Sequence, residues 1–370
     1  FMTIKNKVNQ LLAAFSLGLL AISGANASEQ NIPQPFRGET KNSKFEINYD
    51  DYNAVLKSSV LLIGKSQRTK AKASNGSIGT RMKTRINKLT ALEGNRVYFE
   101  GLNEEEYKNL LLDMRKSLES VPSEAPLNLF TADEQLAYWL NLYNISLLNE
   151  VLKIYPSRKL DDLIEDDDSV LHDKILNISN VPLSLKDIEN ILYEKYDADP
   201  LVIYGMFQGI IGGPNIRKSP YSGASVWAQL ESNANEFINS NRGTYADKKN
   251  VVRVSSLYER NARYFPEFEL DVKSHLLKYL EGSTRFALED AKRVKYNIND
   301  WKIVDILGNQ RAYGGSVNTN SAAFIDSVSA PTIPGLSGVG AANLGLAASF
   351  LGDRSMSFGR FTADQAELLK

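Results

Sequence analysis

The chain lacks cysteine altogether. None of its 370 residues is a cysteine, which excludes disulfide bonds, a thiolate nucleophile and any zinc or iron–sulfur site held by sulfur ligands. Histidine is nearly as scarce, with only His172 and His275. Two imidazoles are a poor supply for a histidine-rich metal site or a Ser-His-Asp triad. The sequence therefore predicts no metal, no cofactor and no conventional catalytic residue.

The chain also has almost no net charge. Lysine and arginine total 43 against 44 acidic residues, which gives a formal net charge of -1. Such a chain has no overall field that would attract nucleic acid or an anionic membrane. We therefore expect no nucleic-acid partner, and any electrostatic partner must meet a local patch.

No apolar run is long enough to cross a bilayer as a helix, which takes about 20 residues. The N-terminal run from Leu11 to Ile22 follows two lysines and ends at Ala25-Asn26-Ala27. A basic start, a short apolar stretch and small residues at the end are typical of a secretory signal peptide. We expect residues 1–27 to be removed, leaving a periplasmic or secreted protein of the Gram-negative type with no transmembrane segment.

The rest of the chain has the composition of a folded protein, with 43% apolar and 24% charged residues. Residues 28–100 are predicted to form an N-terminal arm, in which the polar stretch 28–45 lies on the surface and a helix spans 49–62. Residues 101–310 form the main domain. Residues 311–370 are rich in glycine, serine and alanine, and form either a loosely ordered tail or one that packs against the body or a second copy.

One segment is strongly asymmetric in charge. From Lys65 to Lys88 it carries eight basic residues and no acid. A solvated basic loop is the simpler interpretation, and a patch for an acidic partner, phosphate or glycan is the alternative. No aromatic residues alternate with these cations, as they do where single-stranded nucleic acid binds. The candidate patch comprises Lys70, Lys72, Arg81, Lys83 and Arg85.

Hydrophobic periodicity predicts a mainly helical, single α+β domain with a few short strands. Thr131 and Glu134 form a predicted capping box before a helix that continues to Leu152 and is apolar on nearly all sides, so we expect it at the centre. Ser184 and Asp187 predict a second capped helix. The other predicted helices span 104–118, 225–239 and 270–280, and predicted strands lie at 97–100, within 175–183 as a pair, and at 251–254.

Four segments carry the most specific pattern in the chain: Glu134–Asn144, Leu183–Glu189, Asp199–Ile216 and Val254–Phe265. In order and spacing they resemble the domain of unknown function 547 family, whose members carry a Trp-Ile-Asn-x-Tyr-Asn helix like the first segment. The resemblance covers about residues 125 to 305.

Family members usually carry an Ile-His pair and an Asn-Cys…Cys-Pro segment within the third of these stretches. Here Ile203, Gln208 and Gly213 stand where that histidine and those two cysteines would fall. A histidine near a cysteine is typical of a thiol enzyme. The resemblance therefore implies a thiol-enzyme-like scaffold whose reactive positions are replaced in this chain.

The candidate cleft is drawn from the family-like helix and from the strip 199–216. Asn141 and Asn144 lie three residues apart on one helix face, where their amides either brace the loop at 208–216 or line a cleft. Trp139 is either a core side chain or a platform for a ligand. The full candidate set is Trp139, Asn141, Asn144, Tyr204, Gln208, Gly212, Gly213 and Pro214.

Two short patterns imitate ligand sites. Gly212–Ser219 nearly matches a phosphate-binding loop, but Arg217 replaces its second glycine and Pro214 removes an amide N–H. We interpret this stretch as a tight, buried turn. The acidic run Glu165–Asp168 offers oxygen ligands but lacks the spacing of a calcium loop, so a solvated acidic loop is the better interpretation.

We therefore expect an exported, non-catalytic binding or scaffold protein whose degenerate thiol-enzyme-like domain binds a partner protein or an envelope polymer. One alternative is a cysteine-independent hydrolase acting on envelope glycan or peptide, with Asp187, Glu189 and Glu259 as the available acids. Two carboxylates about 5 to 9 Å apart in a cleft would favour that alternative, whereas acids that cap helices or meet basic side chains would weaken it. Another alternative is a structural subunit of an oligomer, such as a homo-oligomer, assembled through the tail.

Overall fold

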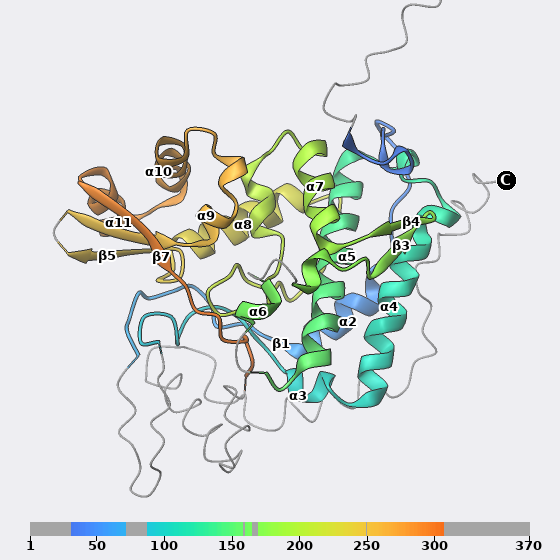
Figure 1. Cartoon of the computed structure of the whole chain (residues 1–370), viewed down its shortest axis with the longest axis horizontal. Helices are drawn as coiled ribbons and strands as arrows, with labels where there is room; N and C mark the ends of the chain where they lie inside the picture. Colours follow the sequence, from blue (N-terminus) through green and yellow to red (C-terminus); the bar gives the residue numbers. More distant parts are fainter. Residues whose placement is uncertain (1–30, 72–86, 158–159, 165–168, 249, 307–370) are drawn as a thin grey trace, which may run out of the picture.

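A long helix, α5 (Ala132–Ile154), lies at the centre of the fold (Figure 1). Every side chain of α5 from Glu134 to Leu152 is buried, which confirms the predicted central position. Its start is fixed by Thr131, whose hydroxyl oxygen accepts a hydrogen bond from the Glu134 amide (3.2 Å). The computed structural model describes residues 31–71, 87–157, 160–164, 169–248 and 250–306.

Three further helices pack against α5. Ser184 and Asp187 form the predicted capping box at the start of one of them, α7 (Leu185–Lys195), since each side chain bonds the backbone amide of the other residue. A short hairpin precedes this helix and turns through Ser179 and Asn180, which both have positive φ. These helices and strands are α4 (Glu105–Glu124), α7 (Leu185–Lys195), α8 (Val226–Ile238), β3 (Leu176–Ile178) and β4 (Val181–Leu183).

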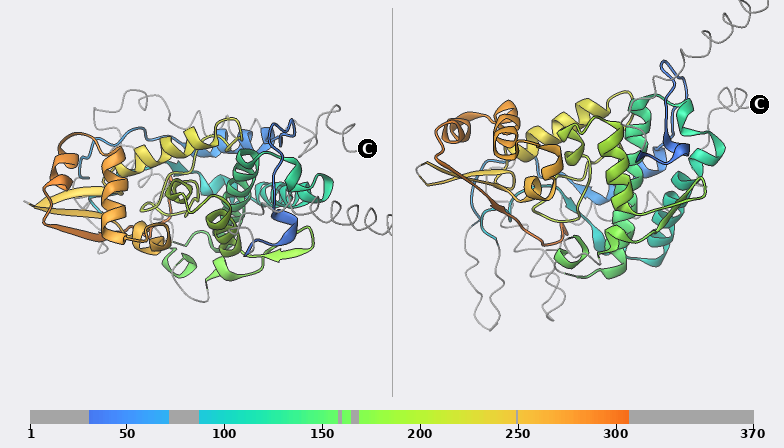
Figure 2. Two further views of the ribbon diagram at one scale, coloured as in Figure 1. Left: turned by 90° about the horizontal axis from the view of Figure 1, so that it is seen from above. Right: turned by 45° about the horizontal axis from the view of Figure 1, so that its top comes forward.

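A three-stranded sheet lies beside this helical part. Its order is β5 (Thr244–Lys248), β6 (Val251–Ser255), β7 (Arg293–Ile298), and β6 pairs antiparallel with β5 and parallel with β7. Helices α10 (Phe268–Tyr279) and α11 (Gly282–Glu289) cover one side of the sheet (Figure 2). Of these three strands, the sequence predicted only β6.

The first described residues belong to the same core. Ile32 and Phe36 are buried, so the prediction that the stretch 28–45 lies on the surface is wrong for these two side chains. The Phe36 ring meets the Trp139 indole edge to face, with centroids 5.1 Å apart. The chain continues through α2 (Asp50–Ser59) and β1 (Val60–Leu61), and β1 pairs with β2 (Arg96–Val97).

These elements confirm a mainly helical α+β fold with a few short strands. The strand predicted at 97–100 is wrong in its second half because a helix begins at Phe99, and the helix predicted at 104–118 continues to Glu124. The short helices are η2 (Gln34–Phe36), α3 (Phe99–Leu102), η3 (Leu127–Leu129), α6 (Asp161–Ile164), η4 (Val170–His172), η5 (Pro200–Tyr204), α9 (Leu257–Arg260) and η6 (Ala262–Tyr264), where η marks a 3-10 helix.

The predicted signal peptide (1–27), the acidic run at 165–168 and the tail (311–370) lie outside the described residues. So does most of the basic segment, from 72 to 86. Within the described ranges, no helix combines the length and the apolar character needed to cross a bilayer.

Candidate functional site

The strip 199–216 begins as a buried 3-10 helix. The Asp199 carboxylate accepts a hydrogen bond from the Leu201 amide (2.8 Å) and so caps η5. Ile203, which stands at the family's histidine position, is 1% exposed. This position therefore faces the core and offers no contact to solvent.

The two candidate amides of α5 both hold backbone. Asn144 donates to the Gly205 carbonyl (3.0 Å) and accepts from the Phe207 amide (2.9 Å). Asn141 donates to the carbonyl of Tyr221 (2.8 Å) and accepts from the amide of the same residue (2.9 Å). The amides therefore act as braces, and the backbone that they hold flanks the loop 208–216 on either side.

The glycine-rich stretch is a tight, buried turn, as the sequence indicated. The Gly212 amide donates to the Asp300 carbonyl (2.9 Å), and a Cβ on Gly212 would lie 2.5 Å from the Asp300 backbone nitrogen. The Gly213 carbonyl accepts from the buried guanidinium of Arg242 (2.7 Å), and Pro214 is buried beside it. Only glycine permits the backbone approach at position 212.

The two positions that the resemblance assigns to cysteines are neighbours in space. A Cβ on Gly213 would lie 3.2 Å from the Cβ of Gln208. The side-chain oxygen of Gln208 accepts a hydrogen bond from Arg260 (3.0 Å), whose guanidinium lies 4.7 Å from the centre of the Trp301 ring. An amide held by an arginine thus stands at one of the two positions that the resemblance assigns to cysteine.

Tyr204 connects the strip to a histidine. Its hydroxyl oxygen lies 2.8 Å from Nε2 of His275 and 3.1 Å from the Tyr258 hydroxyl. Burial raises the pKa of Tyr204 well above its ordinary value and lowers the pKa of His275 to about 4. Both side chains are therefore uncharged at neutral pH and bond to each other as neutral groups.

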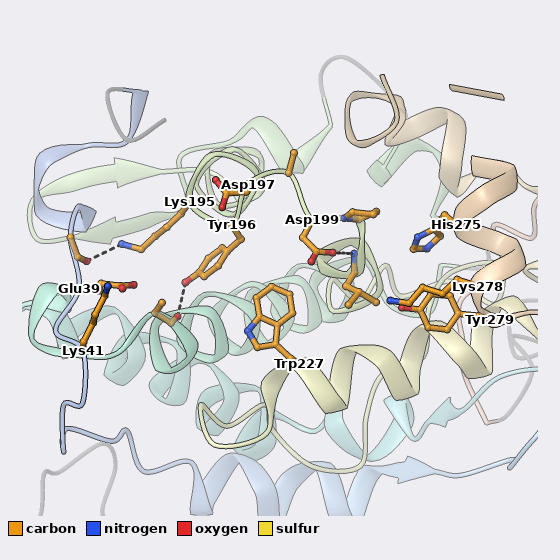
Figure 3. Close-up of a pocket in the computed structure, with 15 residues that line it drawn as sticks. Glu39, Lys41, Lys195, Tyr196, Asp197, Asp199, Trp227, His275, Lys278 and Tyr279 are labelled. Carbon is orange, nitrogen blue, oxygen red and sulfur yellow. Dashed lines mark hydrogen bonds between the residues drawn. The ribbon is translucent and has the colours of Figure 1, made fainter. Parts of the chain in front are cut away.

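A pocket of about 1030 Å³ is lined in part by His275 (Figure 3). We call it the Trp227 pocket. The side chains around it come from the first described segment and from the end of α7. Others come from the starts of η5 and α8 and from the last turns of α10. None of the predicted cleft residues lines it, and Tyr204 reaches it only through His275. Its labelled lining is Glu39, Lys41, Lys195, Tyr196, Asp197, Asp199, Trp227, His275, Lys278 and Tyr279.

The aromatic side chains of the pocket are held in fixed orientations. The indole N–H of Trp227 donates to the Asp133 carboxylate (2.8 Å). The Tyr196 ring meets this indole edge to face, with centroids 6.2 Å apart, and its hydroxyl donates to the Ala132 carbonyl (2.9 Å). A ligand would therefore meet rings that need little reorganisation.

Charges of both signs surround these rings. Lys41 and Glu39 lie at one end of the pocket, Asp197 and Asp199 lie along its length, and Lys278 lies at the other end near His275 (Figure 3). Asp197 has φ of 51° and the next residue, Ala198, has φ of 54°. Two successive non-glycine residues in the left-handed region make this wall locally strained.

The structure describes only one member of the predicted basic patch. Lys70 places its ammonium 4.7 Å from the centre of the Tyr245 ring on β5. Its neighbour Arg68 donates to the Thr244 carbonyl (2.7 Å) and so ties this segment to the sheet. The remaining members, Lys72, Arg81, Lys83 and Arg85, lie outside the described residues.

Two of the three acids available to a hydrolase are engaged elsewhere. Asp187 caps α7 and pairs with Lys174. Glu189 accepts from the Tyr143 hydroxyl (3.1 Å) and pairs with Lys186 (2.7 Å). Glu259 is exposed on α9. The described part of the chain also contains no group of three or more histidine and acidic residues that could hold a metal ion.

Comparison with protein families supports the resemblance for three of the four segments, since the fourth, Val254–Phe265, lies beyond the matched range. Residues 127–238 match the sequence model of DUF547, a protein family of unknown function. The matched range includes Asn141, Asn144, Ile203, Gln208 and Gly213. No curated protein and no solved structure matches the chain.

Proposed function

We propose that this chain, a DUF547 protein over residues 127–238, is an exported, non-catalytic binding protein whose Trp227 pocket holds part of a partner protein or an envelope polymer. The observation that carries the proposal is the lining of the pocket. An indole of fixed orientation lies between acids and lysines that come from distant parts of the sequence. Apolar rings with a few placed polar groups are the ordinary makeup of a ligand site.

The positions at which the resemblance places a histidine and two cysteines supply no catalytic group in this chain. Gln208 is neither a nucleophile nor a base, and its oxygen is already bonded to Arg260. Ile203 and Gly213 carry no group that transfers a proton. His275 is a weak general base because its lowered pKa of about 4 lies far from neutral pH.

A glycan-bearing polymer suits this lining. The apolar faces of sugar rings pack against an indole, while hydroxyl groups exchange hydrogen bonds with carboxylates and ammonium groups. Peptide bonds and charged termini would be met by the same acids and by Lys41 or Lys278. Peptidoglycan combines these two kinds of group, so we use it as the probe.

The test is co-sedimentation of the mature protein with purified peptidoglycan sacculi, followed by fluorescence titration with soluble fragments. Trp227→Ala should weaken binding by about tenfold or more, which corresponds to losing about 1.4 kcal/mol of ring contact. Phe286→Ala is the matched control because it removes an aromatic ring that is 65% exposed on α11, outside the pocket. Equal binding by wild type and Trp227→Ala would overturn the proposal.

A second experiment tests whether the protein is catalytic. Wild-type protein should release no product from a model ester or peptide. Hydrolysis that disappeared in Gln208→Ala would show that the degenerate positions are catalytic after all. Export is tested separately, by N-terminal sequencing of protein recovered outside the cytoplasm, where the chain should begin near Ser28.

A further inference from the structure

The three-stranded sheet has a second face, opposite the one that α10 and α11 cover (Figure 2). Directly paired residues of neighbouring strands point to the same face of a sheet. Tyr245 of β5 pairs with Arg253 of β6, and Arg253 pairs with Lys295 of β7. These three side chains therefore form a row across the sheet, and Lys70 extends the row because its ammonium lies over the Tyr245 ring.

The covered face confirms this assignment. Val252 and Val254 alternate with Arg253 along β6 and are buried. On β7, Tyr296 alternates with Lys295 and packs against Phe268 of α10, with ring centroids 4.8 Å apart. The row of cations thus lies on the side away from these helices.

The cations of this face are available to a ligand. Lys70, Arg293 and Lys295 are exposed and Arg253 is half-buried. Within the described residues, none of these four side chains forms an ion pair. Arg253 instead donates from Nε to the side-chain oxygen of Asn297 (2.8 Å), which fixes its guanidinium plane.

We propose that this face, formed by Lys70, Tyr245, Arg253, Arg293 and Lys295, binds a linear acidic polysaccharide. The row crosses the strands in steps of about 4.8 Å, the spacing of neighbouring strands, so its cations meet successive anionic groups of an extended chain. Arg and Lys recognise carboxylates by charge-assisted hydrogen bonds. The Tyr245 ring within the row favours a sugar over inorganic polyphosphate, because only the sugar has an apolar ring face to pack on it.

This site is independent of the Trp227 pocket and adds a second ligand to the proposed function. The two sites share no residue. A failure of one site can therefore be told from a failure of the other, since Trp227→Ala should leave binding at the sheet face unchanged.

The experiment is a titration of the mature protein with polygalacturonate at two salt concentrations. Affinity should fall roughly 7- to 50-fold between about 50 and 200 mM salt, if two to four contacts each release about 0.7 counterion. The double variant R253Q/K295Q should bind at least fivefold more weakly and show a shallower salt dependence. Y245A, which leaves the charge unchanged, should also weaken binding.

The matched control is K57Q/K116Q, which removes two exposed lysines from α2 and α4 and should bind as wild type does. Circular dichroism checks that each variant is folded. Binding that is insensitive to salt, or equal in R253Q/K295Q and K57Q/K116Q, would overturn the site. Equal affinity for polyphosphate or for phosphatidylglycerol vesicles, with no effect of Y245A, would overturn the polysaccharide as its ligand.

Discussion

Single buried polar side chains hold the backbone around Ile203, Gln208 and Gly213, the three positions that the resemblance singled out. Asn144 serves two peptide groups and Arg242 serves the Gly213 carbonyl and both carboxylate oxygens of Glu236. None of these contacts needs a thiol or an imidazole. The same backbone can therefore form with Ile203, Gln208 and Gly213 at these positions.

Asn144→Ala should lower the free energy of unfolding by about 2 to 4 kcal/mol, because it leaves the Gly205 carbonyl and the Phe207 amide buried without partners. Urea denaturation followed by circular dichroism measures the change. Asn109→Ala, on the exposed side of α4, is the control and should stay within about 0.5 kcal/mol of wild type. Similar losses in the two variants would contradict the bracing role.

His275 should make stability depend on pH. Its pKa is about 4 in the folded protein because of burial, against about 6.5 in an unfolded chain. Between these values the unfolded state binds a proton that the folded state does not, so stability is full above about pH 6.5 and is lost as pH falls toward 4. The loss is up to about 3 kcal/mol, at 1.36 kcal/mol per pKa unit.

The variant H275Q should flatten this part of the stability profile, while keeping a hydrogen-bonding group near Tyr204. Urea unfolding at intervals between pH 4 and 7 measures the profile. H172Q removes the exposed histidine and should keep the slope of wild type. A slope that survives in H275Q would assign the effect to other groups.

The chain immediately after α7 forms a strained wall of the Trp227 pocket. Ala198 has φ of 54°, a conformation that costs an L-residue roughly 1 kcal/mol and glycine almost nothing. Ala198→Gly should therefore stabilise the protein by about 0.5 kcal/mol. The same change at Ala287, inside α11, should destabilise it by about 1 kcal/mol. Thermal unfolding compares them, and equal signs would refute the strain.

The turn at 208–213 brings positions 208 and 213 close together, and this closeness can be tested. The chain has no cysteine, so Q208C/G213C would carry only two thiols. Their Cβ atoms would start 3.2 Å apart, close to the 3.5 to 4.5 Å that a disulfide requires. Mild oxidation should remove both thiols from titration in the monomer, whereas each single variant should keep its thiol. Free thiols in the oxidised double variant would contradict this adjacency.

Local signals made part of the fold predictable. The caps of α5 and α7 and the periodicity of α8 and α10 lie within short stretches of sequence, so the sequence indicated these helices. Strand β7 was missed because its parallel partner, β6, lies about 40 residues away and no turn joins them. The Trp227 pocket was missed for the same reason, since its lining runs from Gly38 to Tyr279 without any local pattern.

The molecule as a whole is tied together across its sequence. One hydrophobic core runs from Ile32 to Val304. The Val97 amide donates to the Val304 carbonyl (2.8 Å), which joins an early strand to the last described segment. The Ile47 amide donates to the Glu134 carboxylate (2.9 Å) at the start of α5. Early and late parts of the chain thus complete the same core.

This continuity predicts that a protein beginning at residue 101 will not unfold cooperatively. It would lack β1, β2 and the Phe36 ring, and Trp139 would lose one of its edge-to-face partners. Its urea transition should be broad, and its tryptophan emission should shift to longer wavelength. A protein beginning at residue 31 keeps these contacts and should show one steep transition. A steep transition in the shorter protein would instead support the boundary between residues 100 and 101 that the sequence predicted.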